Sequence, residues 1–139
     1  TDELIVAMNP EHPLAKKDNL SVDELKGVDF IAFEKDIPTR KATDEILRNA
    51  DIEVSIAMEF DNVETVKRAL EINAGVAIIP KNTASNEVQR NQLVISRLDN
   101  GKHIRPLSLI HKKNRMLTPA LRSFIEKMKH SPLAEKISA

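Results

Sequence analysis

Residues 60–80 read FDNVETVKRALEINAGVAIIP. Asp61 and Asn62 are residue types that cap helix N-termini, and the apolar residues after them recur at helical spacing. Gly75 is a typical helix terminator. The apolar run from 76 to 80 ends at a proline and has the length of a buried strand. The stretch therefore predicts a helix from 61 to about 73, followed by a strand over 75–80.

The residues before this stretch repeat the alternation of strands and helices. We predict strands over 4–8, 29–33 and 52–60, because each is an apolar run or an apolar–polar alternation. A short helix over 21–27 begins with a capping-box pattern, and a longer one covers 38–50. On that longer helix, Asp44 and Arg48 are spaced for a favourable i,i+4 pair.

The residues after the stretch continue with less regular signals. A brief helix over 82–90, strands over 93–98 and 104–111, and a last helix over 118–130 are predicted. Thr118 and Pro119 suit a helix start, and the last helix has an apolar face made of Leu121, Phe124, Ile125 and Met128. Strands that alternate with helices indicate an α/β fold with a mostly parallel sheet covered on both faces.

Composition excludes several classes of function. Lys plus Arg and Asp plus Glu number 21 each, so no basic excess marks a DNA-binding surface. The chain has no cysteine, and its four histidines lie far apart, so we expect no metal site and no cofactor. Known phosphate-binding and nucleophile motifs are absent, which argues against an enzyme. No apolar run reaches the ~20 residues that span a membrane.

Two predicted helix starts are candidate binding sites, at residues 36–40 and 60–65. Each follows a strand at its carboxyl end, where open α/β sheets place ligands. Free N–H groups at a helix start, with a nearby hydroxyl and guanidinium, suit a small organic anion. In the alternative interpretation Thr39, Asp61 and Asn62 are only caps and Arg40 is a surface residue.

The order of these segments resembles a known family. Residues 60–70 and 75–80 resemble the central signature of LysR-type regulator effector domains. Residues 4–8 with 11–15 resemble that family's strand and its HPLA segment, and 21–27 with 30–33 resemble the stretch that follows. Residues 107–111 and 117–124 resemble the C-terminal strand and helix. The resemblance spans nearly all 139 residues.

The resemblance implies a fold similar to type 2 periplasmic binding proteins, with two α/β subdomains joined by crossover strands. Residues 1–13 would be a crossover strand and hinge, and 14–98 a nearly complete second subdomain. Residues 99–139 would be a crossover strand and the C-terminal helix of the first subdomain, whose other part would precede this chain. The effector-binding residues it implies are Thr39, Arg40, Asn62, Val63 and Thr65.

The function implied is sensing of a small metabolite by a cytoplasmic transcription regulator. DNA would be contacted only through an N-terminal domain that this chain lacks, and the chain would form a homo-oligomer. We expect a dimer or higher oligomer because the elements that should cover 4–8, 107–110 and the apolar face of the last helix are partly missing. Two alternatives share the fold: a solute-binding protein of a transport system, and a small-molecule enzyme. The first needs an export signal and the second convergent catalytic groups.

Overall fold

The computed structural model describes residues 2–99, 101–105, 110, 112 and 116–129. The chain divides into two compact units. The larger unit covers Glu3–His103, and the smaller one combines the first two residues with the chain from Ile104 onward. Among the described residues, no helix is both long and apolar enough to cross a membrane.

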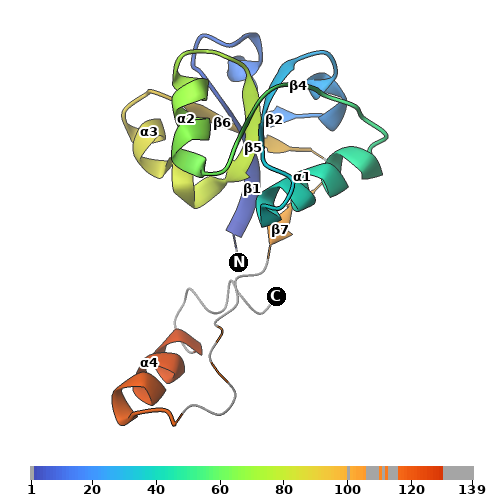
Figure 1. The fold of residues 1–139 in the computed structure, drawn as a ribbon. Helices are drawn as coiled ribbons and strands as arrows, with labels where there is room; N and C mark the ends of the chain where they lie inside the picture. Colours follow the sequence, from blue (N-terminus) through green and yellow to red (C-terminus); the bar gives the residue numbers. More distant parts are fainter. Residues whose placement is uncertain (1, 100, 106–109, 111, 113–115, 130–139) are drawn as a thin grey trace. The chain divides into compact units, whose positions relative to one another are not determined.

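The larger unit is built on a mixed sheet whose strands follow the order β2-β6-β1-β5-β3-β4 (Figure 1). β1 runs antiparallel to both of its neighbours, β5 and β6. β3 is parallel to β4 and β5, and β2 is parallel to β6. The strands are β1 (Asp2–Met8), β2 (Asn19–Leu20), β3 (Asp29–Phe33), β4 (Ser55–Phe60), β5 (Val76–Pro80) and β6 (Val94–Leu98).

Helices cover both faces of this sheet, so alternate residues of one strand enter different cores. In β1, Leu4, Val6 and Met8 join the core on the α1 side, whereas Ile5 and Ala7 join the core on the α2 and α3 side. This two-sided burial explains why the strand is a continuous apolar run. The helices of this unit are α1 (Pro38–Asn49), α2 (Val63–Glu71) and α3 (Ser85–Gln89), with 3₁₀ turns η1 (Pro13–Lys16), η2 (Val22–Leu25) and η3 (Lys81–Ala84).

Most of the predicted elements are confirmed, with shifted bounds. The strand predicted from residue 52 begins at Ser55, because Asp51 ends α1 with a positive φ of 56° and the next residues form no strand pairs. The helix predicted over 21–27 is the 3₁₀ turn η2. The two-residue strand β2 has no signal in the sequence pattern.

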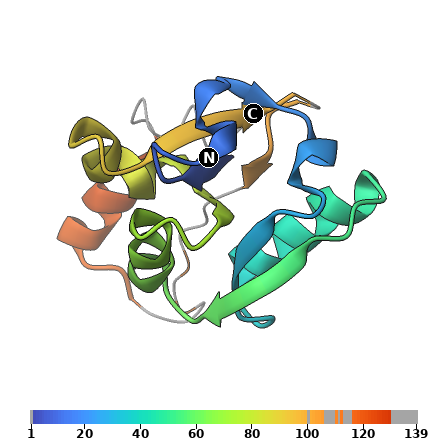
Figure 2. The same ribbon diagram turned by 90° about the horizontal axis from the view of Figure 1, so that it is seen from above.

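One premise of the predicted oligomer is wrong. The elements that cover residues 4–8 are present, because β5 and β6 flank β1 and every residue from Leu4 to Met8 is buried. β4, in contrast, is the last strand in the order and forms an outer edge of the sheet (Figure 2). Two large apolar residues of this edge strand, Ile56 and Met58, are exposed.

The smaller unit contains β7 (Ile104–Arg105) and α4 (Pro119–Lys129). The predicted cap of the last helix is confirmed, since the hydroxyl of Thr118 accepts a hydrogen bond from Leu121 N at 3.3 Å. No residue of α4 is buried by the described part of the chain, and Phe124 is exposed. Residues 106–109 and 111 of the strand predicted over 104–111 lie outside the described residues, as does His130.

Gly75 connects α2 to β5 through a very close backbone approach. Its φ is +150°, and a Cβ atom at this position would lie 2.2 Å from the carbonyl oxygen of Asp29. Asp29 begins β3, and the next residue, Phe30, pairs with Val76 of β5. A glycine is therefore required for β5 to start beside β3.

We predict that Gly75→Ala destabilises the fold by roughly 3 kcal/mol or more, because the Cβ would collide with backbone that cannot rotate away. The matched control is Gly27→Ala, where φ is +73° but no atom lies within 4 Å of the added Cβ. That control should cost only about 1–2 kcal/mol of backbone strain. Urea unfolding of both variants measures the difference, and equal losses would contradict the steric explanation.

Candidate functional site

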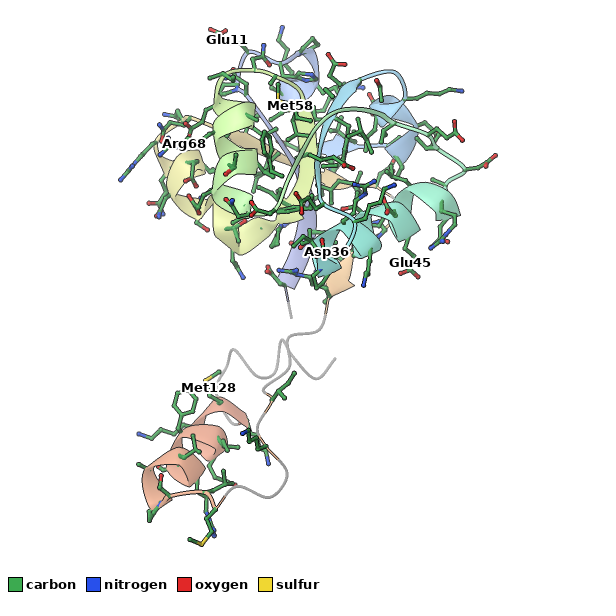
Figure 3. All side chains as sticks on the ribbon, viewed as in Figure 1. Glu11, Asp36, Glu45, Met58, Arg68 and Met128 are labelled. Carbon is green, nitrogen blue, oxygen red and sulfur yellow. The ribbon has the colours of Figure 1, made fainter. Side chains whose placement is uncertain are left out.

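The carboxyl ends of β3, β4 and β5 meet at one edge of the sheet, which we call the carboxyl edge. β3 leads into α1 and β4 leads into α2, and these helices pack on opposite faces. Figure 3 shows Asp36, which precedes α1, at this end of the larger unit, and Glu11 at the opposite end. All five predicted site residues lie in the first turns of α1 and α2, or directly before them.

The start of α2 is capped as the sequence predicts. Asn62 Oδ1 accepts hydrogen bonds from Thr65 N at 2.9 Å and from the Thr65 hydroxyl at 3.0 Å. The backbone N–H groups of Val63 and Glu64, in the first turn, have no acceptor within the helix. Because Asn62 is exposed and Val63 only partly buried, these N–H groups form a positively polarised surface suited to an anion.

The start of α1 differs, because no side chain caps it. Its N-cap residue is Ile37, and Pro38 occupies the first helical turn. The interpretation of Thr39 as a cap is wrong: Thr39 is a buried residue inside the first turn. Thr43, one turn later, is also buried, and its hydroxyl has no hydrogen-bond partner among the described residues. Among the described residues, the N-cap position of α1 therefore supplies no side-chain cap, and the next N–H groups belong to the buried residues Thr39 and Arg40.

Arg40 is buried, with 6% of its surface exposed, so the interpretation of it as a surface residue is wrong. Its Nη1 donates to the carbonyl oxygen of Phe33 at 2.7 Å and also to Glu59. Its Nε donates to Asp44 at 2.8 Å. The sequence spacing had predicted an ion pair between Asp44 and Arg48. In the structure Asp44 pairs with Arg40 instead. Arg40 joins α1 to the carboxyl ends of β3 and β4.

Charge effects at Arg40 favour its ionised form. Desolvation by burial lowers the pKa of Arg40, but its hydrogen bonds to Glu59 and Asp44 outweigh that effect and raise the pKa above its ordinary value. Both carboxylates are partly exposed, so part of the attraction is screened by water. The guanidinium is therefore a permanent cation that is already matched by two anions of the same chain.

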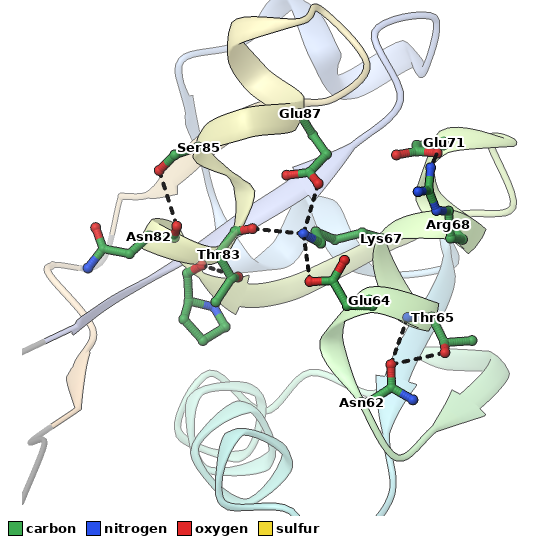
Figure 4. A network of polar contacts seen from close by, with 11 residues as sticks. Asn62, Glu64, Thr65, Lys67, Arg68, Glu71, Asn82, Thr83, Ser85 and Glu87 are labelled. Carbon is green, nitrogen blue, oxygen red and sulfur yellow. Dashed lines mark hydrogen bonds and ion pairs between the residues drawn. The ribbon is translucent and has the colours of Figure 1, made fainter.

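A second buried cation, Lys67, fastens α2 and was not singled out in the sequence (Figure 4). Its Nζ donates to Glu87 at 2.8 Å and to the carbonyl oxygen of Thr83 at 3.0 Å, and it pairs with Glu64 at 2.9 Å. A signal was present: Lys67 follows Val66 and precedes Leu70 by three residues, within the inward-facing stripe of α2. The ammonium group joins α2 to η3 and α3.

The ionisation of this network follows from its geometry. Burial lowers the pKa of Lys67, but hydrogen bonds to Glu87 and Glu64 raise it above the ordinary value. The hydrogen bond from Lys67 lowers the pKa of Glu87 in turn. Within the part of the chain that the structure describes, the other carboxylate oxygen of Glu87, Oε2, is buried and has no hydrogen-bond partner. Both shifts favour the charged forms of Lys67 and Glu87, so the two residues form an ion pair at physiological pH.

His12 has a structural role in this chain. His12 Nδ1 accepts a hydrogen bond from Leu14 N at 3.2 Å and so caps η1. Desolvation by burial lowers the pKa of His12, which keeps the ring neutral as this cap requires. Within the described ranges, no group of three or more His, Asp or Glu side chains could hold a metal ion.

Comparison with known proteins gives consistent results. The family model described as "LysR substrate binding domain" matches residues 1–131. A "Probable RuBisCO transcriptional regulator" of Synechocystis sp. is 28% identical over 130 residues, which cover 91% of this chain and 38% of that protein. The protein of the same name from Chlorokybus atmophyticus is 29% identical over 126 residues, covering 88% of this chain and 40% of that one. The chain therefore spans about two fifths of these relatives.

Solved structures share the fold. The regulatory domain of Synechocystis CcmR, solved in complex with 2-PG, has a TM-score of 0.76 at 21% identity and covers 99% of this chain and 64% of its own. The effector-binding domain of QuiR, in complex with shikimate, has a TM-score of 0.71 at 19% identity and covers 90% and 58%. At these identities the likeness concerns the fold.

We predict that Arg40→Met destabilises the larger unit by about 2 kcal/mol. The change leaves the carbonyl of Phe33 and two carboxylates without their donor, a loss reduced by the exposure of both carboxylates. The matched control is Arg48→Met, an exposed arginine on the same helix, which should change stability by less than about 0.5 kcal/mol. Chemical unfolding tests both, and a neutral Arg40→Met would show that these contacts contribute nothing.

Proposed function

Because this chain belongs to the LysR substrate-binding domain family, we propose that it is the effector-sensing part of a longer transcription regulator. A small molecule bound to it would modulate DNA binding by a separate helix-turn-helix domain. The observation that carries the proposal is the family match over residues 1–131, joined to two helix starts that meet at one sheet edge. Its fold is the type 2 periplasmic-binding-protein-like fold of LysR effector domains.

The charge and the length of this chain both support the proposal that it senses the effector while a separate domain binds DNA. This chain has a formal net charge of zero, whereas proteins that bind DNA through phosphates need clustered cations. Relatives are more than twice as long as the matched segment, which leaves room for a DNA-binding domain elsewhere. We infer a cytoplasmic regulator that works by ligand binding and not by catalysis. The relatives are regulators, which favours this function over a transport-associated binding protein.

The proposed effector site lies on the carboxyl edge. Asn62, Val63 and Thr65 would bind the ligand at the start of α2, and Thr39 would contribute from the start of α1. Arg40 is already paired with Asp44 and Glu59. It would contribute mainly by holding the start of α1 against β3 and β4. The polarised N–H groups at the exposed start of α2 favour a small organic anion. Related domains solved with 2-PG and with shikimate support a small-molecule effector.

We retain the subdomain assignment as part of the proposal. Residues 14–98 would form the second subdomain, residues 1–13 a crossover strand and hinge, and residues 99–139 a crossover strand and a helix of the first subdomain. On the apolar face of α4 no residue is buried by the described part of the chain, which supports this assignment because such a face requires a covering element.

We predict that Thr65→Val weakens effector binding roughly threefold to tenfold, the value of one neutral hydrogen bond. Valine keeps the shape of threonine but loses the hydroxyl, and Asn62 can still cap the backbone of α2. The measurement is calorimetry on the complete regulator with 2-PG, shikimate and a panel of small organic acids. The control is Ser55→Ala, which removes an exposed hydroxyl at the amino end of β4. Unchanged affinity in Thr65→Val would remove this residue from the site, and binding of no panel member would contradict the sensing function.

We also propose that the chain forms a homo-oligomer through β4. This strand has one neighbour in the described sheet, β3, so its outer backbone groups are open to pairing. Ile56 and Met58 are 42% and 41% exposed, and Met58 is labelled on β4 in Figure 3. Apolar side chains on an unpaired edge strand favour association.

We predict that Met58→Lys shifts the protein toward the monomer, because a charge on an edge strand opposes strand pairing. Light scattering over a dilution series measures the mass of each variant. Ile72→Lys is the matched control, since Ile72 is an equally apolar and more exposed residue outside β4. A monomer at all concentrations before any substitution, or equal effects of both substitutions, would contradict association through β4.

A further inference from the structure

A hollow of about 410 Å³ lies over β1 and β6, among residues that the proposed effector site does not include. We call it the β1–β6 hollow. Ile5 and Ile95 belong to the core on the α2 and α3 side of the sheet and form its apolar part. Its polar lining includes Asn19 from β2, Lys81 after β5 and Arg97 from β6. All of these residues belong to the larger unit.

Strand register brings two cations together beside this hollow. Leu4 pairs with Pro80 and Val6 pairs with Ser96. Extending the two registers by one residue each places Glu3 opposite Lys81 and Ile5 opposite Arg97. Side chains two residues apart on a strand share a face, so Glu3, Lys81 and Arg97 project from the same face. The pairing of the strands therefore brings the charged side chains of Glu3, Lys81 and Arg97 together.

Glu3 holds both cations weakly. Its Oε2 lies 3.4 Å from Lys81 Nζ, and its Oε1 lies 3.5 Å from Arg97 Nε. Strong charge-assisted hydrogen bonds are about 2.7–2.9 Å long. Both contacts are longer than this, so the carboxylate of Glu3 forms two weak ion pairs and no strong one. Lys81 and Arg97 are 39% and 59% exposed, and each can reorient toward an incoming ligand.

Arg97 keeps most of its binding capacity. Within the part of the chain that the structure describes, Glu3 is approached through Nε of Arg97. The two Nη groups of the guanidinium can still form the paired donors that recognise a carboxylate or a phosphate. A concave surface with low-dielectric walls also concentrates the field of such cations more than a flat surface does.

We propose that the β1–β6 hollow is a second binding site, for one small oxyanion group held between Lys81 Nζ and the Nη groups of Arg97. The Asn19 amide can add a donor from the rim. Glu3 acts as an internal competitor for the same cations, and Asp18, also in the lining, limits the site to ligands of low charge. Lys81, Arg97, Glu3 and Asp18 sum to zero charge before the ligand arrives, so the site can balance no more than a single carboxylate or phosphate group.

The competitor role of Glu3 gives the proposal its sharpest test. Glu3→Gln removes the competing charge and keeps a side chain of the same shape, so oxyanion affinity should rise severalfold. Lys81→Met and Arg97→Gln each remove one charged donor and should lower affinity roughly tenfold or more. The control is Arg90→Gln, which removes an exposed cation after α3, outside the lining.

The experiment is NMR titration of the protein at constant ionic strength, in separate arms with inorganic phosphate and with acetate. Saturable shifts of the amides of Asn19 and Ser96 report on this hollow, and Thr65→Val should leave them unchanged if the two sites are separate. Saturation by phosphate alone assigns a phosphate group, by acetate alone a carboxylate, and by both an oxyanion site of either kind. No saturation in either arm, no tightening in Glu3→Gln, or an equal loss in Arg90→Gln would overturn the proposal.

Discussion

The pairing of β1 with β5 on one side and with β6 on the other is the constraint on which the larger unit depends. β1 is the antiparallel member of the sheet, and it contributes to both cores through alternate residues. Full burial of one large aliphatic side chain is worth about 1.5–3 kcal/mol, so this strand contributes much of the hydrophobic stabilisation. Because it runs against its neighbours, its first residues reach the edge where β3, β4 and β5 end. Glu3 is thereby placed between Lys81 and Arg97.

The two helices that begin at the carboxyl edge are each fastened by a buried cation. Arg40 joins α1 to β3 and β4, and Lys67 joins α2 to η3 and α3. Removing one partner from such a contact leaves groups without a donor or acceptor, which costs more than the contact itself contributes. The contacts of Arg40 and Lys67 therefore fix the orientation of the starts of α1 and α2. Polarised N–H groups that are held in place lose little entropy when they bind a ligand.

Local patterns in the sequence predicted the elements well and their partners poorly. Apolar periodicity located α1, α2 and the buried strands, and the side-chain chemistry of Asn62 identified a true cap. Periodicity cannot reveal strand order, so β1 was expected to lie partly uncovered when it is central to the sheet. The burial of Arg40 depends on Glu59, 19 residues away, and its helical spacing to Asp44 gave no indication of that partner. Contacts set by register, such as that of Glu3 with Lys81 across 78 positions, leave no local pattern at all.

If the starts of α1 and α2 are fixed in position, they limit how the proposed effector can change the conformation of the protein. A ligand shifts a conformational equilibrium only by the difference between its affinities for the two states. If Arg40 and Lys67 keep both helix starts in one arrangement, contacts with the carboxyl edge alone are the same in every state and shift nothing. The difference must then come from ligand contacts outside Glu3–His103, with the carboxyl edge supplying binding energy common to all states. Substitutions at Asn62 or Thr65 would accordingly change how tightly the effector binds and leave the size of the response at saturation unchanged.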